Sequence, residues 1–132
     1  MNGLRIASLS LALVSGMAFG AEVKLTGDAE VPPVKTSASG SGTITVAPDG
    51  AVSGSIKATG VDATAAHIHM AAPGKSGPVI VPLTKGSDGT FSVPAGAKLT
   101  DEQMKAYKAG DLYVNVHSEA NKGGEIRAQI AP

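Results

Sequence analysis

The three histidines of the chain fall in two short stretches that alternate between apolar and polar residues. His67 and His69 stand in "AAHIHM", and His117 ends "LYVNVH". Residues i and i+2 of a β-strand project from the same face, with Cα atoms roughly 7 Å apart, so two such imidazoles can meet at one metal ion. A third histidine from a neighbouring strand completes a three-nitrogen site. Imidazole donors suit copper, zinc, nickel and iron, and Cu(II) is the most tightly bound of these.

The same alternation assigns the neighbouring side chains to faces. The segments 112–118 and 125–130 each alternate apolar residues with polar ones, as the histidine strand does. If these strands are neighbours, one face of the sheet gathers a set of polar side chains. This set is His67, His69, Asn115, His117, Glu125 and Arg127.

Four residues are candidates for a supporting role at such a site. Glu125 is best placed to orient an imidazole through its second N–H, or to act as a fourth ligand. Asn115 is a poor strand former and is expected to make a specific hydrogen bond. Met70 faces the apolar side of a regular strand, and only a bulge or strand end would bring its thioether, which favours Cu(I), to the metal. Arg127 can instead form a surface ion pair with Glu125 that adds little stability.

The alternative is that the histidines are solvated side chains on a polar strand face. A lone His-x-His pair is a weak signal of metal binding. No histidine lies outside the two strands, however, and this concentration favours a site.

Composition excludes several other kinds of site. The chain has no cysteine, so it has no thiolate nucleophile, iron–sulfur cluster, cysteine-ligated zinc or blue-copper centre. Its 11 basic and 11 acidic residues balance, without a basic run that would favour nucleic acid or an anionic membrane. The Gly-Lys-Ser at 74–76 is not a P-loop, because His69 stands where that motif needs its first glycine. There is no G-x-S-x-G elbow for a serine nucleophile.

Residues 1–20 have the features of a secretory signal peptide. A positive charge precedes an apolar run too short to span a bilayer, and Ala18 and Gly20 occupy the −3 and −1 positions for cleavage before Ala21. An uncleaved N-terminal anchor is the alternative, whereas the absence of cysteine argues against a lipoprotein. We therefore expect a periplasmic or secreted mature domain, residues 21–132, with no membrane span.

The elements that must position the histidines are mostly short strands. Alternating residues between Gly, Pro, Asp and Ser predict strands and one hairpin turning at Asp49–Gly50. The predicted strands cover 22–33, 64–70, 77–83, 89–96, 111–118 and 124–130, and the hairpin covers 41–60.

One helix is expected over 99–110. Thr100 is its N-cap, Gln103 completes a capping box, and Gly110 ends it, while Met104 and Tyr107 pack at the edge of the sheets. Many short strands and one short helix predict an all-β fold, an antiparallel Greek-key β-sandwich.

Two blocks of sequence resemble a known family. "HIHMAAPGKSGPVIVPL" and "KAGDLYVNVHSEANKGGEIRAQI" are similar to the CHRD domain, named after chordin and common in exported bacterial proteins. The resemblance runs from about Glu22 to the C-terminus, and Ser118 and Ala128 stand where the family commonly has Thr and Gly. It implies an immunoglobulin-like or Cu,Zn superoxide dismutase-like sandwich, whose copper-site analogy transfers only to the three histidines. In chordin the domain belongs to a secreted growth-factor antagonist, a binding context that does not carry over to a small free-standing chain.

These observations predict an exported metal-binding protein whose three histidines hold copper for storage, delivery or tolerance, with zinc as the rival ion. Two other functions stay open. One is an extracytoplasmic structural or protein-interaction module without a metal. The other is a mononuclear copper or zinc enzyme with Glu125 as its acid–base group. A non-enzymatic role is favoured, and the sequence fixes neither a protein partner nor the oligomeric state.

Overall fold

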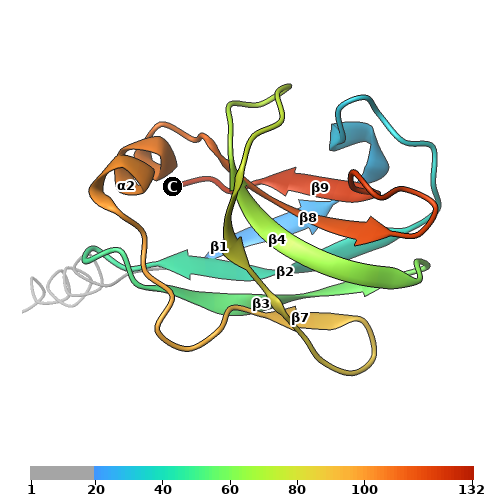
Figure 1. The fold of residues 1–132 in the computed structure, drawn as a ribbon, viewed down its shortest axis with the longest axis horizontal. Helices are drawn as coiled ribbons and strands as arrows, with labels where there is room; N and C mark the ends of the chain where they lie inside the picture. Colours follow the sequence, from blue (N-terminus) through green and yellow to red (C-terminus); the bar gives the residue numbers. More distant parts are fainter. Residues whose placement is uncertain (1–19) are drawn as a thin grey trace, which may run out of the picture.

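The computed structural model describes residues 20–132, which form two antiparallel β-sheets packed on one another (Figure 1). The predicted signal peptide falls, apart from Gly20, outside these residues. The first sheet has the order β1 (Ala21–Leu25), β2 (Ser39–Val46), β3 (Val52–Thr59), β7 (Thr90–Ser92) and β6 (Thr84–Lys85). The second sheet has the order β5 (Val79–Pro82), β4 (Ala63–Met70), β8 (Leu112–Ser118) and β9 (Ile126–Gln129).

The chain crosses repeatedly between the sheets, as a Greek-key sandwich requires. β7 pairs with β3, and β8 pairs with β4, although neither pair is consecutive along the chain. The sheets also meet along one edge, where Thr26 and Arg127 exchange two backbone hydrogen bonds of 3.1 and 3.0 Å. The predicted all-β sandwich is confirmed.

The β2–β3 hairpin forms where the sequence predicts it. The side chain of Asp49 accepts a hydrogen bond from the backbone N–H of Ala51 at 3.0 Å, and Gly50 adopts a φ of +92°. Only glycine takes this conformation without strain, so the Asp-Gly pair fixes the turn.

The first strand is shorter than predicted. We expected a strand over 22–33, but β1 ends at Leu25 and the chain turns through the 3₁₀ helix η1 (Gly27–Ala29). The carbonyl of Gly27 accepts hydrogen bonds from the N–H groups of both Glu30 and Val34, which closes a compact loop instead of extending the strand. β6 is a two-residue strand that the sequence pattern does not reveal.

The predicted helix is present as α2 (Asp101–Lys108). Thr100 Oγ1 accepts from the Gln103 N–H, and Gln103 Oε1 accepts from the Thr100 N–H, so the capping box is complete. Met104 and Tyr107 pack against the core as expected. Among residues 20–132, no helix has the length and apolar character needed to cross a membrane.

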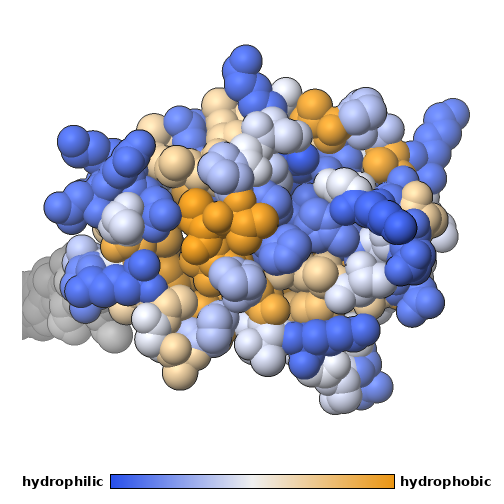
Figure 2. Space-filling model, viewed as in Figure 1, coloured by the Kyte–Doolittle hydropathy of each residue, from blue (hydrophilic) through white to orange (hydrophobic). Residues whose placement is uncertain are grey.

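The core lies between the inner faces of the two sheets. Phe91, Val114, Val116, Ile126 and Ile130 are fully buried there. On the outside, Figure 2 shows a mostly hydrophilic surface on which the most extensive hydrophobic group lies near the middle of this view, with smaller hydrophobic groups elsewhere.

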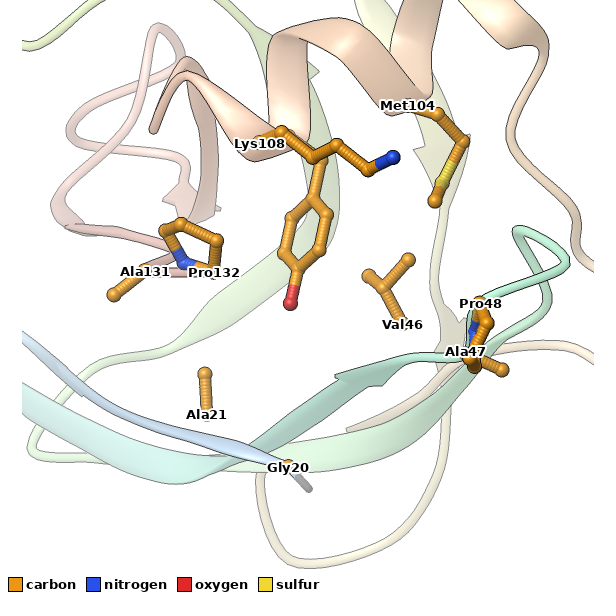
Figure 3. Close-up of a pocket in the computed structure, with 10 residues that line it drawn as sticks. Gly20, Ala21, Val46, Ala47, Pro48, Met104, Lys108, Ala131 and Pro132 are labelled. Carbon is orange, nitrogen blue, oxygen red and sulfur yellow. The ribbon is translucent and has the colours of Figure 1, made fainter. Parts of the chain in front are cut away.

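A surface pocket of about 520 Å³ lies beside α2. Met104 and Lys108 lie on its helical side, and Ala21, Val46 and Pro132 line it from the sheet and the C-terminus (Figure 3). No histidine lines it, so the candidate site is elsewhere.

Candidate metal centre

The pairing of β4 with β8 brings the three histidines together. In this register Ala65 lies opposite His117, His67 opposite Asn115, and His69 opposite Tyr113. The outer face of the second sheet therefore carries His67 and His69 on one strand and His117 on the next, two residues beyond the partner of His67 and four beyond the partner of His69. The histidine grouping predicted from alternation exists in the folded chain.

The distances between the rings suit one shared ion. His67 Nδ1 and His117 Nε2 lie 3.0 Å apart, and one nitrogen from each of the three rings lies within 4.8 Å of the others. Two nitrogens that each bind an ion at about 2.0 Å lie about 3 Å apart when the angle between the bonds is close to 90°. The third nitrogen lies within 4.8 Å of the other two, so all three rings are near enough for one ion to be shared once the side chains rotate toward it.

Backbone carbonyls fix which nitrogen of two rings is free. His69 Nδ1 donates to the Gly77 carbonyl at 3.0 Å, and His117 Nδ1 donates to the Lys122 carbonyl at 2.8 Å. A carbonyl only accepts, so both protons reside on Nδ1 and both Nε2 atoms keep a lone pair for a metal. Without a metal, the lone pair of His117 Nε2 accepts the Nδ1 proton of His67, so this hydrogen bond must break before His117 Nε2 can bind an ion.

The Nε2 atom of His69 is buried and has no hydrogen-bond partner within residues 20–132. His69 is only 8% exposed. A buried polar atom without a partner is costly and rare. An ion bound by the three histidines would satisfy this atom, so the residues present fit a metal.

Burial also keeps two of the imidazoles neutral. It lowers the pKa of His67, and the positive charge that His117 or His69 would carry lowers it further. Burial likewise lowers the pKa of His69, although the hydrogen bond to Gly77 opposes this in part. Metal ligation needs neutral imidazole, so these environments favour binding.

Asn115 and Met70 occupy opposite faces of the sheet. Asn115 is 1% exposed and lies beside His69 and Glu30, close enough to affect the pKa of both. Its Oδ1 atom makes no hydrogen bond to any described residue. Met70 packs against the core on the other face, although the β4–β5 pairing does contain an irregularity at Ile68 and His69.

Glu125 supports a turn and does not contact an imidazole. Its carboxylate accepts hydrogen bonds from Thr36, Ser118 and Asn121, and these bonds, led by that from Ser118, lower the pKa of Glu125. The turn that it braces, residues 119–124, carries the Lys122 carbonyl that holds His117. The structure thus gives the orienting role to backbone carbonyls, and Glu125 acts one step further out.

The expected surface ion pair between Arg127 and Glu125 is not formed. Arg127 pairs with Glu30 at 3.1 Å, and both side chains are only 3% exposed. Glu30 was not among the predicted site residues, because it fell in a segment assigned to the first strand, and β1 ends five residues earlier. An acidic residue within the otherwise apolar "AEVPPV" is the one signal that marked it.

A loop covers the outer face of the second sheet, a face whose polar residues had suggested exposure to solvent. Residues 71–78, which we call the strap, cross this face, and Tyr113 beneath them is only 1% exposed. Arg127 donates to the Lys75 carbonyl at 2.8 Å, and Gly77 donates to the Tyr113 hydroxyl at 3.1 Å. In Figure 1 the strap and the η1 segment rise on the same side of the second sheet.

Comparison with known proteins identifies the domain. The model of the CHRD domain family matches residues 21–130, nearly all of the chain. Among curated proteins and solved structures, no match was found. The family match agrees with the resemblance carried by the histidine strand and by the C-terminal pair of strands. The chain therefore belongs to the CHRD domain family.

Proposed function

We propose that this protein binds one copper ion through His67, His69 and His117 and serves copper storage, delivery or tolerance outside the cytoplasm. The observation that carries the proposal is the buried, unpartnered Nε2 of His69, on a ring that has a nitrogen within 4.8 Å of nitrogens of two further imidazoles. The signal-peptide features of residues 1–20 support the location.

The donor set favours copper, with zinc as the rival ion. Three imidazoles bind both metals, and the intrinsic order of affinities places Cu(II) above Zn²⁺. His67 and His117 are partly exposed, so an ion can reach the site from solvent without unfolding the sheet.

Carriage of the ion is favoured over catalysis. Glu125 was the one acid–base candidate, and Thr36, Ser118 and Asn121 occupy its carboxylate. A group held in this way is poorly placed to exchange protons with a molecule at the metal.

Titration of the metal-free mature protein with Cu(II) and Zn²⁺, followed by electron paramagnetic resonance, tests the proposal. We expect one tightly bound copper per chain with nitrogen hyperfine structure. A folded variant carrying His67→Ala, His69→Ala and His117→Ala should lose both features, whereas Met70→Leu should keep them. Weak binding that the triple substitution leaves unchanged would overturn the proposal and favour the interaction module.

A further inference from the structure

The buried ion pair of Arg127 and Glu30 makes no direct contact with the histidines. Glu30 Oε1 accepts a hydrogen bond from Arg127 Nε at 3.1 Å, Arg127 Nη2 lies 3.1 Å from the same oxygen as an ion pair, and both side chains are almost fully buried. Well-packed apolar residues often replace such pairs without loss of stability, so stability is a weak reason for a buried pair beside this site. Its other contacts indicate a different role.

Arg127 anchors the strap. Its Nη1 donates to the Lys75 carbonyl at 2.8 Å, and its Nη2 reaches the hydroxyl of Ser76 at 3.3 Å. The next residue of the strap is Gly77, whose carbonyl accepts the Nδ1 proton of His69. The guanidinium therefore fixes the backbone that decides the tautomer of His69.

Arg127 also holds the ring that packs on His69. Its guanidinium carbon lies 3.9 Å from the centre of the Tyr113 ring. Tyr113 stacks on His69 with ring centres 4.8 Å apart and planes only 1° from parallel. Since β8 lies between β4 and β9, Tyr113 separates the cation from the imidazole. The hydroxyl of Tyr113 accepts from Gly77, which joins this contact to the strap.

We propose that the Glu30–Arg127 pair is a positioning device for the metal centre, which fixes the ring plane of His69 through Tyr113 and its tautomer through the strap. The inference rests on the proposed copper site. The negative charge of Glu30 compensates the positive charge of the buried Arg127 guanidinium, so Arg127 can stay beneath the strap instead of turning to solvent. The result is an Nε2 lone pair that is in place before an ion arrives, which is the preorganisation that tight binding needs.

The first arm of the test uses metal-free protein. Imidazole ¹⁵N chemical shifts of the wild-type protein should show His69 protonated on Nδ1 alone. In Glu30→Gln the strap loosens, and we expect His69 to become a mixture of both tautomers. Glu22→Gln makes the same chemical change at an exposed position of β1 and should leave the tautomer unchanged.

The second arm measures copper affinity in a double-mutant cycle. Glu30→Gln should weaken Cu(II) binding at least tenfold in the wild-type protein. The same substitution in a His69→Ala background should have no further effect, because the ligand through which Glu30 acts is already absent. A general loss of stability would instead weaken binding in both backgrounds.

A second variant guards against misfolding of Glu30→Gln. Combining Glu30→Gln with Arg127→Met removes both charges, so no buried charge is left uncompensated, while the strap still loses its anchor. If this folded variant keeps the Nδ1 tautomer and wild-type copper affinity, the inference is wrong. If the tautomer changes but the wild-type protein binds no copper, the positioning role stands and the copper proposal fails.

Discussion

At the scale of single residues, two backbone carbonyls set the tautomers of His69 and His117, and burial lowers the pKa values of His67 and His69. The carbonyls of Gly77 and Lys122 hold the protons of His69 and His117 on Nδ1, leaving Nε2 for an ion. A hydrogen bond from Nδ1–H to a carbonyl also makes the Nε2 atom of the same ring a more basic metal ligand. Neither carbonyl is visible as a motif, because any residue supplies one.

The lowered pKa values of His67 and His69 predict copper binding that persists in mild acid. Below the ordinary histidine value of 6.5, a solvated ligand begins to lose metal to protons. Here the folded pKa values lie lower, so affinity should stay nearly constant from pH 7.5 down to 6.5 and fall only in more acidic solution. Cu(II) titrations across this pH range check the predicted dependence of copper affinity on pH. A steady tenfold loss per pH unit that begins near 7 would contradict the prediction.

Gly124 is predicted to be irreplaceable, whereas its neighbour Gly123 is not. Gly124 has a φ of +126°, and a Cβ there would lie 2.5 Å from both Asn115 Nδ2 and Glu30 Oε2. Gly124→Ala should therefore cost at least about 1–3 kcal/mol of unfolding free energy, the range for a strained backbone. No atom lies within 4 Å of a Cβ placed at Gly123, so Gly123→Ala should change the free energy of unfolding by less than about 0.5 kcal/mol. Urea denaturation of the pair measures the difference, and equal losses would show the steric argument to be wrong.

Residue patterning predicted the histidines well and their surroundings poorly. Period-two alternation requires His67 and His69 to share a face, so their grouping followed from the sequence. Glu30 lies 97 positions from Arg127 along the chain, and a long-range pair of this kind leaves no local periodicity. The burial of Tyr113 and Asn115 also escaped prediction, because it depends on a strap whose path no pattern fixes.

At the scale of elements, α2 is stabilised locally and stands apart from the metal centre. Its capping box satisfies two backbone N–H groups, those of Thr100 and Gln103. α2 leads into the start of β8, whereas His117 lies near the end of that strand. Changes to the cap should therefore alter stability without altering metal binding.

Thr100→Ala tests this separation. Loss of an N-cap acceptor costs about 1 kcal/mol, so the free energy of unfolding should fall by that amount while copper affinity stays at the wild-type value. Thr100→Ser keeps the hydroxyl and should retain most of the stability. Chemical denaturation and copper titration of both variants give the two readouts. A change in affinity beyond twofold would mean that α2 is coupled to the centre.

Elements with strong local signals were predicted closely, and those set by tertiary contacts were not. The hairpin has its Asp-Gly turn, and α2 has its capping box. β6 follows the point at which the chain passes from the second sheet to the first, and η1 turns the chain between β1 and β2 of the first sheet; nothing in their composition shows either. β1 ends early because the next residue, Thr26, pairs with Arg127 of the second sheet.

At the scale of the whole molecule, the pKa shifts predict that metal-free protein loses stability in mild acid. In the unfolded chain His67 and His69 take up protons near pH 6.5, but in the folded chain they do so only at lower pH. The unfolded state then binds more protons, so the free energy of unfolding falls as pH drops below 6.5. Glu30 acts in the opposite sense, because burial raises its pKa despite Arg127.

Comparison with a His67→Gln, His69→Gln variant isolates the histidines. Urea denaturation at pH 7.5 and 5.5 should show a larger loss of stability for the wild-type protein than for this variant. Equal losses would mean that the two imidazoles titrate alike in the folded and unfolded chains.

Copper binding should stabilise the entire sandwich, since the three ligands join β4 to β8 at the middle of the second sheet. A ligand that binds only the folded state at 100 times its dissociation constant adds about 2.7 kcal/mol, equivalent to roughly 10 °C in melting temperature for a domain of this size. Calorimetry with and without Cu(II) measures the shift, and Zn²⁺ should give a smaller one. The variant lacking all three histidines is the necessary control, because imidazoles of the unfolded chain also bind copper and reduce the effect. If copper raises the melting temperature of that variant equally, the ion binds elsewhere and the three-histidine centre is not its site.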